Sequence, residues 1–498
     1  MKRLFTASAV LLLVACGASD PFTGSASSKA DAPTAVKDKP RVVVAVLDTG
    51  INPYHSFLYQ GSPIYPDAAP SAVTPEVLAE FGIDAKHIIE VQRTGNYGAD
   101  FLRDREMWMA VERGVPYWIK NTNIIVASFI EPGPSRIPVL AEGSTHGVGT
   151  SGSVLTANPE AIVFFIEQGD DGIGSPETHT YAFTHPAVDM MSTSYGVSEA
   201  LGLLPAVEYG AFNETFTGVV ELGKMHFSSG GNGPGLTNFR AGAGPWWSIG
   251  VSGFEEGSNN GRTILSGNFP DFIADFTQEL PYCLSCEDGY EFVGGTSFST
   301  PRSAGVASKI LLEVRRALGH KGGIIVRDGA APVMAEGKGQ SITNWQIRRA
   351  LEEAAYIPTA TEFDPAALVD EAVGLGLSFG LPINPAAPWL QTGWGEISAD
   401  PAKNVVSGAL AFLGFGDGAV PAKPMGYCEF NSTIMQERHF WFSTFSPTVH
   451  PVSEQIYGPL APVDEASGGE VRNYSGQQAG RTVDVSPYIY CASAVPAP

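Results

Sequence analysis

Short apolar runs that end in small or polar residues recur along the chain. The run from Val42 to Leu47 is unbroken and mostly β-branched, which is typical of a central parallel strand buried on both faces. Similar runs occur at Ile162–Ile166, Val188–Met191 and Met225–Phe227, and each leads into polar or small residues. Helical or irregular segments separate these runs. The alternation predicts an α/β fold, with a parallel sheet flanked by helices on both faces.

A longer apolar pattern follows Ser297. From Ala304 to Leu318 the apolar residues recur at helical spacing, which predicts a helix ending at Gly319. Ser297 therefore lies at a helix start, where unpaired N–H groups favour negative charge and could stabilise an oxygen anion. Gly294 and Gly295 would let a substrate carbonyl approach the backbone. A simple N-cap role for Ser297 is the alternative.

The segment from about residue 59 to 140 shows no recognisable grouping of chemically active side chains. Its pattern predicts helices around Pro75–Phe81 and Leu102–Arg113 and a strand at Ile124–Ile130. We interpret it as an insertion that covers one edge of the domain.

Composition narrows the function classes. The chain has 498 residues, of which 44% are hydrophobic, as in a soluble globular protein. Its 52 acidic and 30 basic residues give a net charge of -22, which argues against nucleic acid or anionic lipid as a main partner. We expect a monomer.

The N-terminus resembles a secretory signal. Lys2 and Arg3 precede an apolar run from Leu4 to Val14, and the following Ala15-Cys16 resembles the end of a bacterial lipoprotein signal. Cleavage and lipidation at Cys16 would anchor the chain to a membrane without spanning it; an ordinary signal-peptidase cut is the alternative. Residues 17–40 are rich in Ser, Ala, Asp, Lys and Pro and predict a flexible tether.

Four further cysteines allow three pairings in an exported protein. We favour a tight Cys283–Cys286 bridge shortly before Ser297 and a Cys428–Cys491 bridge near the C-terminus. A zinc site is a weaker interpretation, because the second pair lacks close spacing and has no neighbouring His.

Three polar motifs are candidates for chemistry. Asp48 begins Asp-Thr-Gly at the end of the first apolar run, where open α/β sheets place active sites, although Asp is also a common turn residue. His146 lies in a stretch of small residues that could open a helix facing a cleft. Asn232 lies in a glycine-rich turn and could be a turn former or an oxyanion donor. We interpret His55 as structural.

These motifs resemble those of the subtilisin-like serine proteases, the subtilases. The likeness rests on four fragments in the family's order and extends from about Arg41 to about Leu413; Ser194-Tyr195-Gly196, Phe269-Pro270-Asp271 and Gly393-Trp394-Gly395 also fit it. The four fragments are Asp48-Thr49-Gly50, His146-Gly147, Asn232 between glycines, and Gly295-Thr296-Ser297 with Pro301.

The resemblance implies a role for each residue. Ser297 would be the nucleophile, His146 the general base, and Asp48 the group that orients the imidazole. Asn232 and the Ser297 N–H would bind the oxyanion. The resemblance also implies that a peptide substrate lies along one strand and in a pocket, for which the candidates are Ser194, Tyr195, Gly196 and Gly231.

The chain departs from the family in three ways. The family usually has a second His where this chain has Gly149, which questions local packing more than activity. The interval from Asp48 to His146 is unusually long. Between the tether and Arg41 there is no room for a compact inhibitory pro-domain, so how premature activity is avoided is an open question.

A Gly/Pro-rich break at 416–424 predicts a domain boundary. We therefore divide the chain into a signal (1–16), a tether (17–40), a catalytic domain (41–415) and a small β-rich C-terminal extension (416–498). We interpret the extension as a structural cap; a carbohydrate- or partner-binding module is the alternative.

Together these features predict an exported serine endopeptidase acting on protein or peptide substrates. A surface binding or scaffold protein that keeps the fold is one alternative, and an esterase or peptide ligase using the same acyl-enzyme is another. The chemistry requires no cofactor. Structural calcium is possible in this family, but Asp170-Asp171-Gly172 is too short a cluster to identify a site, so we assign no metal ligands.

Overall fold

The computed structural model describes most of the region from Lys39 to Phe415 and little of the chain beyond it. The described residues are 39–133, 136–140, 144–168, 176–195, 198–200, 219, 222–232, 238–240, 248–254, 270–328, 330, 332–357, 393–421, 475–478 and 481–484. The predicted signal, Cys16, Gly196, Cys428 and Cys491 lie outside them, as does most of the predicted tether and C-terminal extension.

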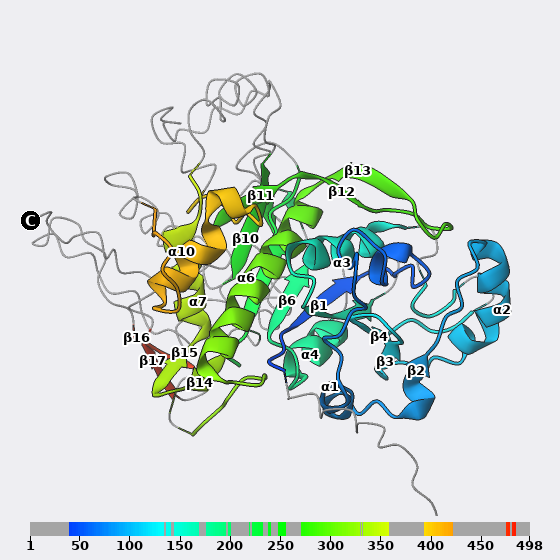
Figure 1. The fold of residues 1–498 in the computed structure, drawn as a ribbon, viewed down its shortest axis with the longest axis horizontal. Coiled ribbons are helices and arrows are strands. Elements are labelled where there is room, and N and C mark those ends of the chain that lie inside the picture. Colours follow the sequence, from blue (N-terminus) through cyan, green and yellow to red (C-terminus); the bar gives the residue numbers. More distant parts are fainter. Residues whose placement is uncertain are drawn as a thin grey trace, which may run out of the picture. The chain divides into compact units, whose positions relative to one another are not determined.

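A sheet of nine strands forms the centre of the described chain (Figure 1). Each neighbouring pair is parallel except β3 and β4, which are antiparallel. From edge to edge the strands are β11 (Phe272–Asp275), β10 (Ile249–Phe254), β8 (Met225–Ser229), β6 (Met190–Thr193), β1 (Val43–Asp48), β5 (Ile162–Glu167), β4 (Ile124–Ser128), β3 (Tyr117–Ile119) and β2 (Ile88–Ile89).

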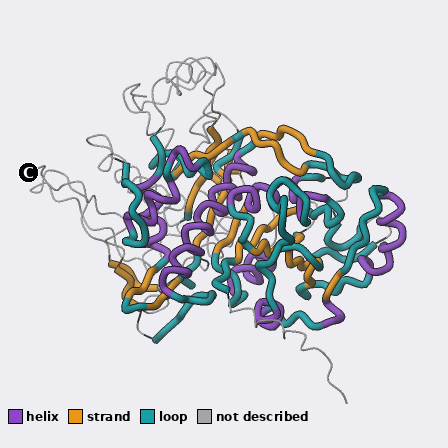
Figure 2. The backbone as a smooth tube through the Cα atoms, in the orientation of Figure 1, coloured by secondary structure: helices purple, strands orange, loops and turns teal. Residues whose placement is uncertain are grey.

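Helices and short hairpins surround this sheet (Figure 2). The helices are α1 (Pro75–Glu80), α2 (Tyr97–Met109), α3 (His146–Ala157), α4 (Pro176–Thr184), α6 (Thr296–Leu318), α7 (Asn344–Ala354) and α10 (Val405–Phe412), with short 3-10 turns at Ser56–Leu58, Ala85–His87 and Pro401–Lys403. The antiparallel pairs are β12 (Thr277–Pro281) with β13 (Tyr290–Gly294), β14 (Ala335–Gly337) with β15 (Gln340–Ile342), β7 (Ser198–Ala200) with β9 (Asn238–Arg240), and β16 (Ser475–Gln478) with β17 (Arg481–Asp484).

Two neighbouring phenylalanines of β5 show that helices cover both faces of the sheet. Successive side chains of a strand point to opposite faces. The Phe164 ring contacts Tyr181 and His185, of α4 and the turn after it. The Phe165 ring lies instead against Gly147, in the first turn of α3, which in turn packs beside α6. The predicted fold class is therefore confirmed.

The four predicted strand runs correspond to β1, β5, β6 and β8, and β1 is wholly buried. The region that we interpreted as an insertion contributes α1 and α2, and it extends the sheet beyond β5 through β4, β3 and β2. Strand β3 runs against the direction of β4, a detail that the alternating pattern did not predict.

Parallel topology gathers the candidate residues at one edge. Strands β6, β1 and β8 lie next to one another in the order β8-β6-β1. Asp48 ends β1, Ser194 follows β6, and Asn232 follows β8. Because the carboxyl ends of parallel strands share one edge of the sheet, these three residues lie at the same edge.

Helix α6 brings Ser297 to this edge. It begins at Thr296, directly after β13, and ends before Gly319, whose φ of 78° is the left-handed conformation of a helix C-cap. Both ends agree with the sequence pattern. None of the helices in the part of the chain that the structure describes is long and apolar enough to cross a membrane.

Candidate active site

Asp48 is a buried carboxylate surrounded by hydrogen-bond donors. Only 2% of the residue is exposed. Its Oδ1 accepts from the Thr49 N–H at 2.8 Å, and its Oδ2 accepts from the Thr150 hydroxyl at 2.9 Å. His146 Nδ1 lies 2.9 Å from both carboxylate oxygens. A buried carboxylate needs such partners, because without them burial strongly disfavours its charge.

His146 is held at the first position of α3, facing Asp48. The helix approaches the loop after β1 so closely that a β-carbon on Gly147 would lie 2.1 Å from the Gly50 carbonyl oxygen. Only glycine allows this approach. The contact of Nδ1 with a carboxylate places the Nδ1 proton toward Asp48 and leaves Nε2 as the hydrogen-bond acceptor of the neutral ring.

Burial and pairing shift the pKa values of Asp48 and His146 in opposite directions. Burial alone would raise the pKa of Asp48, but the His146 imidazole and the hydrogen bonds from Thr49 and Thr150 lower it below its ordinary value. Burial alone would lower the pKa of His146, but the Asp48 carboxylate raises it above its ordinary value. Each group therefore favours the charged form of the other.

Ser297 is the second residue of α6, and its hydroxyl donates to the Ser194 carbonyl oxygen at 3.0 Å. Within the described residues it forms no hydrogen bond with His146. The ring of the next residue, Phe298, packs against the His146 ring with centroids 5.4 Å apart, so Ser297 and His146 belong to one site. Catalytic hydrogen bonds are often long or unformed before a substrate binds.

Pro301 explains a second contact between Ser194 and Ser297. In a regular helix the N–H of residue 301 would donate to the Ser297 carbonyl, but proline has no N–H. The Ser194 hydroxyl instead donates to the Ser297 carbonyl oxygen at 2.6 Å. Ser194 is buried, and its side chain is thereby used to hold the first turn of α6.

The amide of Asn232 is oriented by Thr296. The Asn232 Oδ1 accepts from the Thr296 N–H at 2.8 Å and from its hydroxyl at 2.9 Å. The other end of the amide must then be the NH2 group, a donor. It lies beside Gly295, 3.4 Å from where a β-carbon would stand. Thr296 also accepts from the Gly231 N–H at 3.1 Å, which fixes this loop to α6.

The remaining predicted substrate residues differ in position. The Tyr195 hydroxyl lies 2.9 Å from Gln168 Oε1 and 2.8 Å from His179 Nε2, so its side chain is engaged by α4 and the end of β5. Gly231 is buried in the loop beside Thr296. Gly196 lies outside the described residues.

Gly149 has a packing role in place of the family's second His. A β-carbon at this position would lie 2.8 Å from the Phe298 ring and 2.9 Å from the Tyr282 ring. These two rings pack edge to face, with centroids 5.8 Å apart. Two aromatic rings therefore fill the space next to His146 that a larger side chain on α3 would need.

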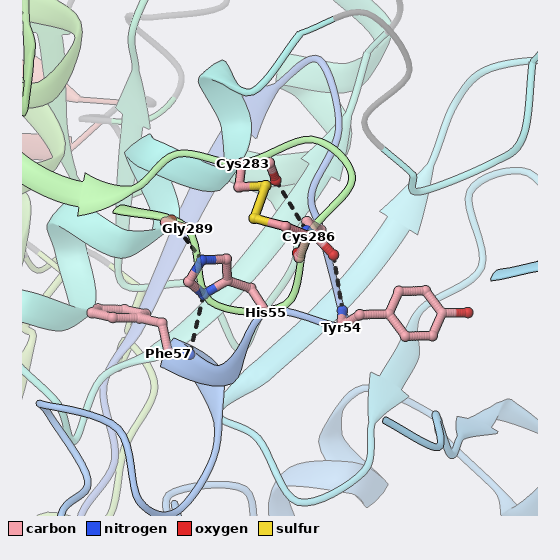
Figure 3. The surroundings of a disulfide bond; sticks show 7 residues. Tyr54, His55, Phe57, Cys283, Cys286 and Gly289 are labelled. Carbon is pink, nitrogen blue, oxygen red and sulfur yellow. Dashed lines mark hydrogen bonds between the residues drawn. A yellow bond between two sulfur atoms is a disulfide. The ribbon is translucent and has the colours of Figure 1, made fainter. Parts of the chain in front are cut away.

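Cys283 and Cys286 form a disulfide with an S–S distance of 2.01 Å at the tip of the β12–β13 hairpin (Figure 3). Asn52 donates to the carbonyl oxygens of both cysteines at 3.0 and 2.8 Å. His55 is fully buried, with Nε2 2.8 Å from the Gly289 oxygen and Nδ1 accepting from the Phe57 N–H. These contacts fit a structural role for His55 and tie the loop after Asp48 to the hairpin that leads into Ser297.

The described residues contain no group of three or more His, Cys, Asp or Glu side chains that could hold a metal ion. Asp170, Asp171 and Gly172 lie outside those residues, so the structure does not address calcium there.

A mostly parallel sheet with Asp, His and Ser gathered at one edge defines a class of protein, the subtilisin-like α/β serine proteases. The model described as the subtilase family matches residues 39–321. This match spans more than half of the 498 residues, and the chain therefore belongs to the subtilase family.

Solved structures of proteases and of a macrocyclase are similar to this chain at low identity. A lanthipeptide protease is 15% identical with a TM-score of 0.42, covering 74% of this chain and 88% of that chain. The PatG macrocyclase in complex with peptide is 11% identical with a TM-score of 0.40, covering 74% and 93%. A structure of proteases from Pseudoalteromonas arctica is 16% identical with a TM-score of 0.38, covering 74% and 90%. The comparison with curated proteins finds no match.

Sequence reasoning did not predict three contacts that shape the site, those of Thr150 with Asp48, of Thr296 with Asn232 and of the Ser194 hydroxyl with Ser297. The sequence contained a signal for two of them. Thr150 is one helical turn after His146, which places both on one helix face. Pro301 is four residues after Ser297, which predicts a free carbonyl that needs a donor. Nothing in the sequence indicates which loop supplies that donor.

The pairing predicts how His146 titrates. In the Ser297→Ala protein, we expect the His146 imidazole to titrate above its ordinary pKa of 6.5. In Ser297→Ala with Asp48→Asn it should titrate below 6.5, because burial remains while the attraction is lost. Because the folded pKa is raised, the stability from protonated His146 is full below pH 6.5 and fades as the pH rises through the folded value.

NMR titration of the histidine ring protons measures both values. His185, whose pKa burial lowers to about 4, is the internal reference. A His146 pKa that stays the same after Asp48→Asn would contradict the assigned pairing.

Proposed function

We propose that this chain is an exported serine endopeptidase that hydrolyses peptide bonds through an acyl-enzyme on Ser297. The observation that carries the proposal is the pairing of the buried Asp48 carboxylate with His146, beside a serine at a helix start. Membership of the subtilase family supports protease chemistry and peptide or protein substrates.

In the proposed mechanism, His146 Nε2 takes the Ser297 proton as Ser297 Oγ attacks the substrate carbonyl carbon. The Ser297 hydroxyl first rotates away from the Ser194 carbonyl, to which it donates in the free protein. Asp48 stabilises the imidazolium that forms, and it keeps the second ring nitrogen protonated. His146 then returns the proton to the leaving amine, and water attacks the acyl-enzyme by the same steps in reverse order.

Two donors would bind the oxyanion of the tetrahedral intermediate. One is the Asn232 NH2 group, whose orientation follows from the two bonds that its oxygen accepts. The other is the backbone N–H of Ser297, which lies in the first turn of α6, where N–H groups lack helical acceptors. The partial positive charge of the helix N-terminus adds to the same effect.

Export is part of the proposal and rests on the sequence. The basic residues and apolar run before Cys16 support secretion with lipidation at that cysteine. A disulfide between Cys283 and Cys286 fits an oxidising compartment. The chain would then act at the outer side of a membrane, attached by lipid alone.

The first test is hydrolysis of an unstructured protein by the mature chain and by Ser297→Ala. The wild type should release new amino termini, and the alanine variant should lose at least about 10⁴-fold in kcat, because the nucleophile is absent. Circular dichroism of both proteins controls for folding. Hydrolysis by a folded alanine variant at the wild-type rate would refute the mechanism.

Adding an amine to the same reaction separates hydrolysis from acyl transfer. Products that end in a free carboxylate support an endopeptidase, whereas products joined to the amine as the main species would favour a ligase. Stoichiometric binding with no turnover would favour the scaffold alternative.

The second test concerns the oxyanion donor. Asn232→Ala should lower kcat by about 10²–10³-fold with little change in KM, because the amide binds the charge that develops in the transition state. Asn96→Ala is the matched control, since Asn96 is exposed and its side chain caps α2. Equal kcat values for Asn232→Ala and the wild type would remove Asn232 from the mechanism.

A further inference from the structure

Helix α3 brings a second polar side chain to Asp48 in addition to His146. Thr150 follows His146 by one helical turn, and residues four apart lie on the same helix face. The Thr150 hydroxyl lies 2.9 Å from Asp48 Oδ2, and Thr150 is fully buried. One face of one helix thus supplies two of the groups that contact the carboxylate.

The hydrogen of the Thr150 hydroxyl has two possible acceptors. Asp48 Oδ2 lies at 2.9 Å and the Gly147 carbonyl oxygen at 3.2 Å. A hydroxyl donates one hydrogen, and the nearer, charged acceptor forms the stronger bond. Thr150 therefore donates to Asp48.

The contacts of Asp48 then fix the plane of its carboxylate. Oδ1 accepts from the Thr49 N–H on the β1 side, and Oδ2 accepts from Thr150 on the α3 side. His146 Nδ1 lies between them, at 2.9 Å from each oxygen. Without Thr150, His146 would be the one donor left to Oδ2 among the described residues. The carboxylate could then rotate.

We infer that Thr150 is a positioning residue: its hydroxyl holds the Asp48 carboxylate in the orientation that His146 requires. The inference rests on the proposed function, in which the Asp48–His146 pair serves Ser297. Thr150 acts through Asp48 and touches neither substrate nor nucleophile.

Among the described residues, few charged groups act on the Asp48–His146 pair. Asp48 and His146 act on each other, and Glu167 is the neighbour of Asp48 on β5. The Glu167 carboxylate is held by the Ser128 hydroxyl at 2.5 Å and the Val139 N–H at 2.6 Å. From α6, the group that packs on His146 is the uncharged Phe298 ring.

Thr150→Val removes the hydroxyl and keeps the β-branched shape, so the helix and its packing are retained. We expect kcat for peptide hydrolysis to fall by about tenfold with KM unchanged, because one charge-assisted hydrogen bond at the pair is lost. The midpoint of the acid limb of kcat/KM should move to lower pH, since a carboxylate that rotates away from Nδ1 holds the His146 proton less tightly. Thr150→Ser should restore both values.

Ser151→Ala is the matched control on the same helix. The Ser151 hydroxyl is buried and has no hydrogen-bond partner among the described residues. Its removal should leave kcat and the pH profile unchanged. An equal loss in Ser151→Ala, or a Thr150→Val enzyme with the wild-type kcat and acid midpoint, would overturn the inference.

A second readout does not depend on turnover. In the Ser297→Ala background, NMR titration should show a lower His146 pKa with Thr150→Val than with Thr150. An unchanged or higher His146 pKa would overturn the inference even if the enzyme proved inactive. A wild-type protein without hydrolytic activity would count against the proposed function alone. Failure of the proposed function and failure of the Thr150 inference are therefore distinguishable.

Discussion

The structure around the site depends on keeping the Asp48 carboxylate charged in a buried place. Burial opposes the charge, but an imidazole, a backbone N–H and a hydroxyl lie within 2.9 Å of the carboxylate oxygens and stabilise it. This demand explains several local features at once. The first turn of α3 must approach the end of β1, which requires glycine at 147, and the helix must present His146 and Thr150 on one face.

A second set of contacts holds the start of α6 beside the Asp48–His146 pair. Pro301 leaves the Ser297 carbonyl without a helical donor, and the hydroxyl of Ser194 fills that place. Thr296 connects the same turn to Asn232 and Gly231. The nucleophile candidate is therefore positioned by the loops after β6 and β8, whereas its partners are positioned by β1 and α3. The β12–β13 hairpin, tied to the loop after Asp48 through Asn52, joins the two sets.

Much of the fold could be predicted because its central strands carry unbroken apolar runs. Strand β1 is the clearest case, since burial on both faces requires apolar residues at every position. Strand β10, Ile-Gly-Val-Ser-Gly-Phe, was missed because its glycines and serine hide the pattern. The site residues Asp48, His146, Asn232 and Ser297 could be proposed from their order along the chain. Several of their hydrogen-bond partners could not be predicted, because these partners lie about 100 positions away in the chain. Examples are Asp48 with Thr150 and Ser194 with Ser297.

Labelling with a fluorophosphonate probe shows whether the Asp48–His146 pair activates Ser297 as a nucleophile. The probe forms a covalent bond with an activated serine and can be located by mass mapping of the modified peptide. We expect a label on Ser297 in the folded mature protein, and none after heat denaturation or in Ser297→Ala. A folded protein that takes up no label at Ser297 would contradict activation of Ser297 by the Asp48–His146 pair.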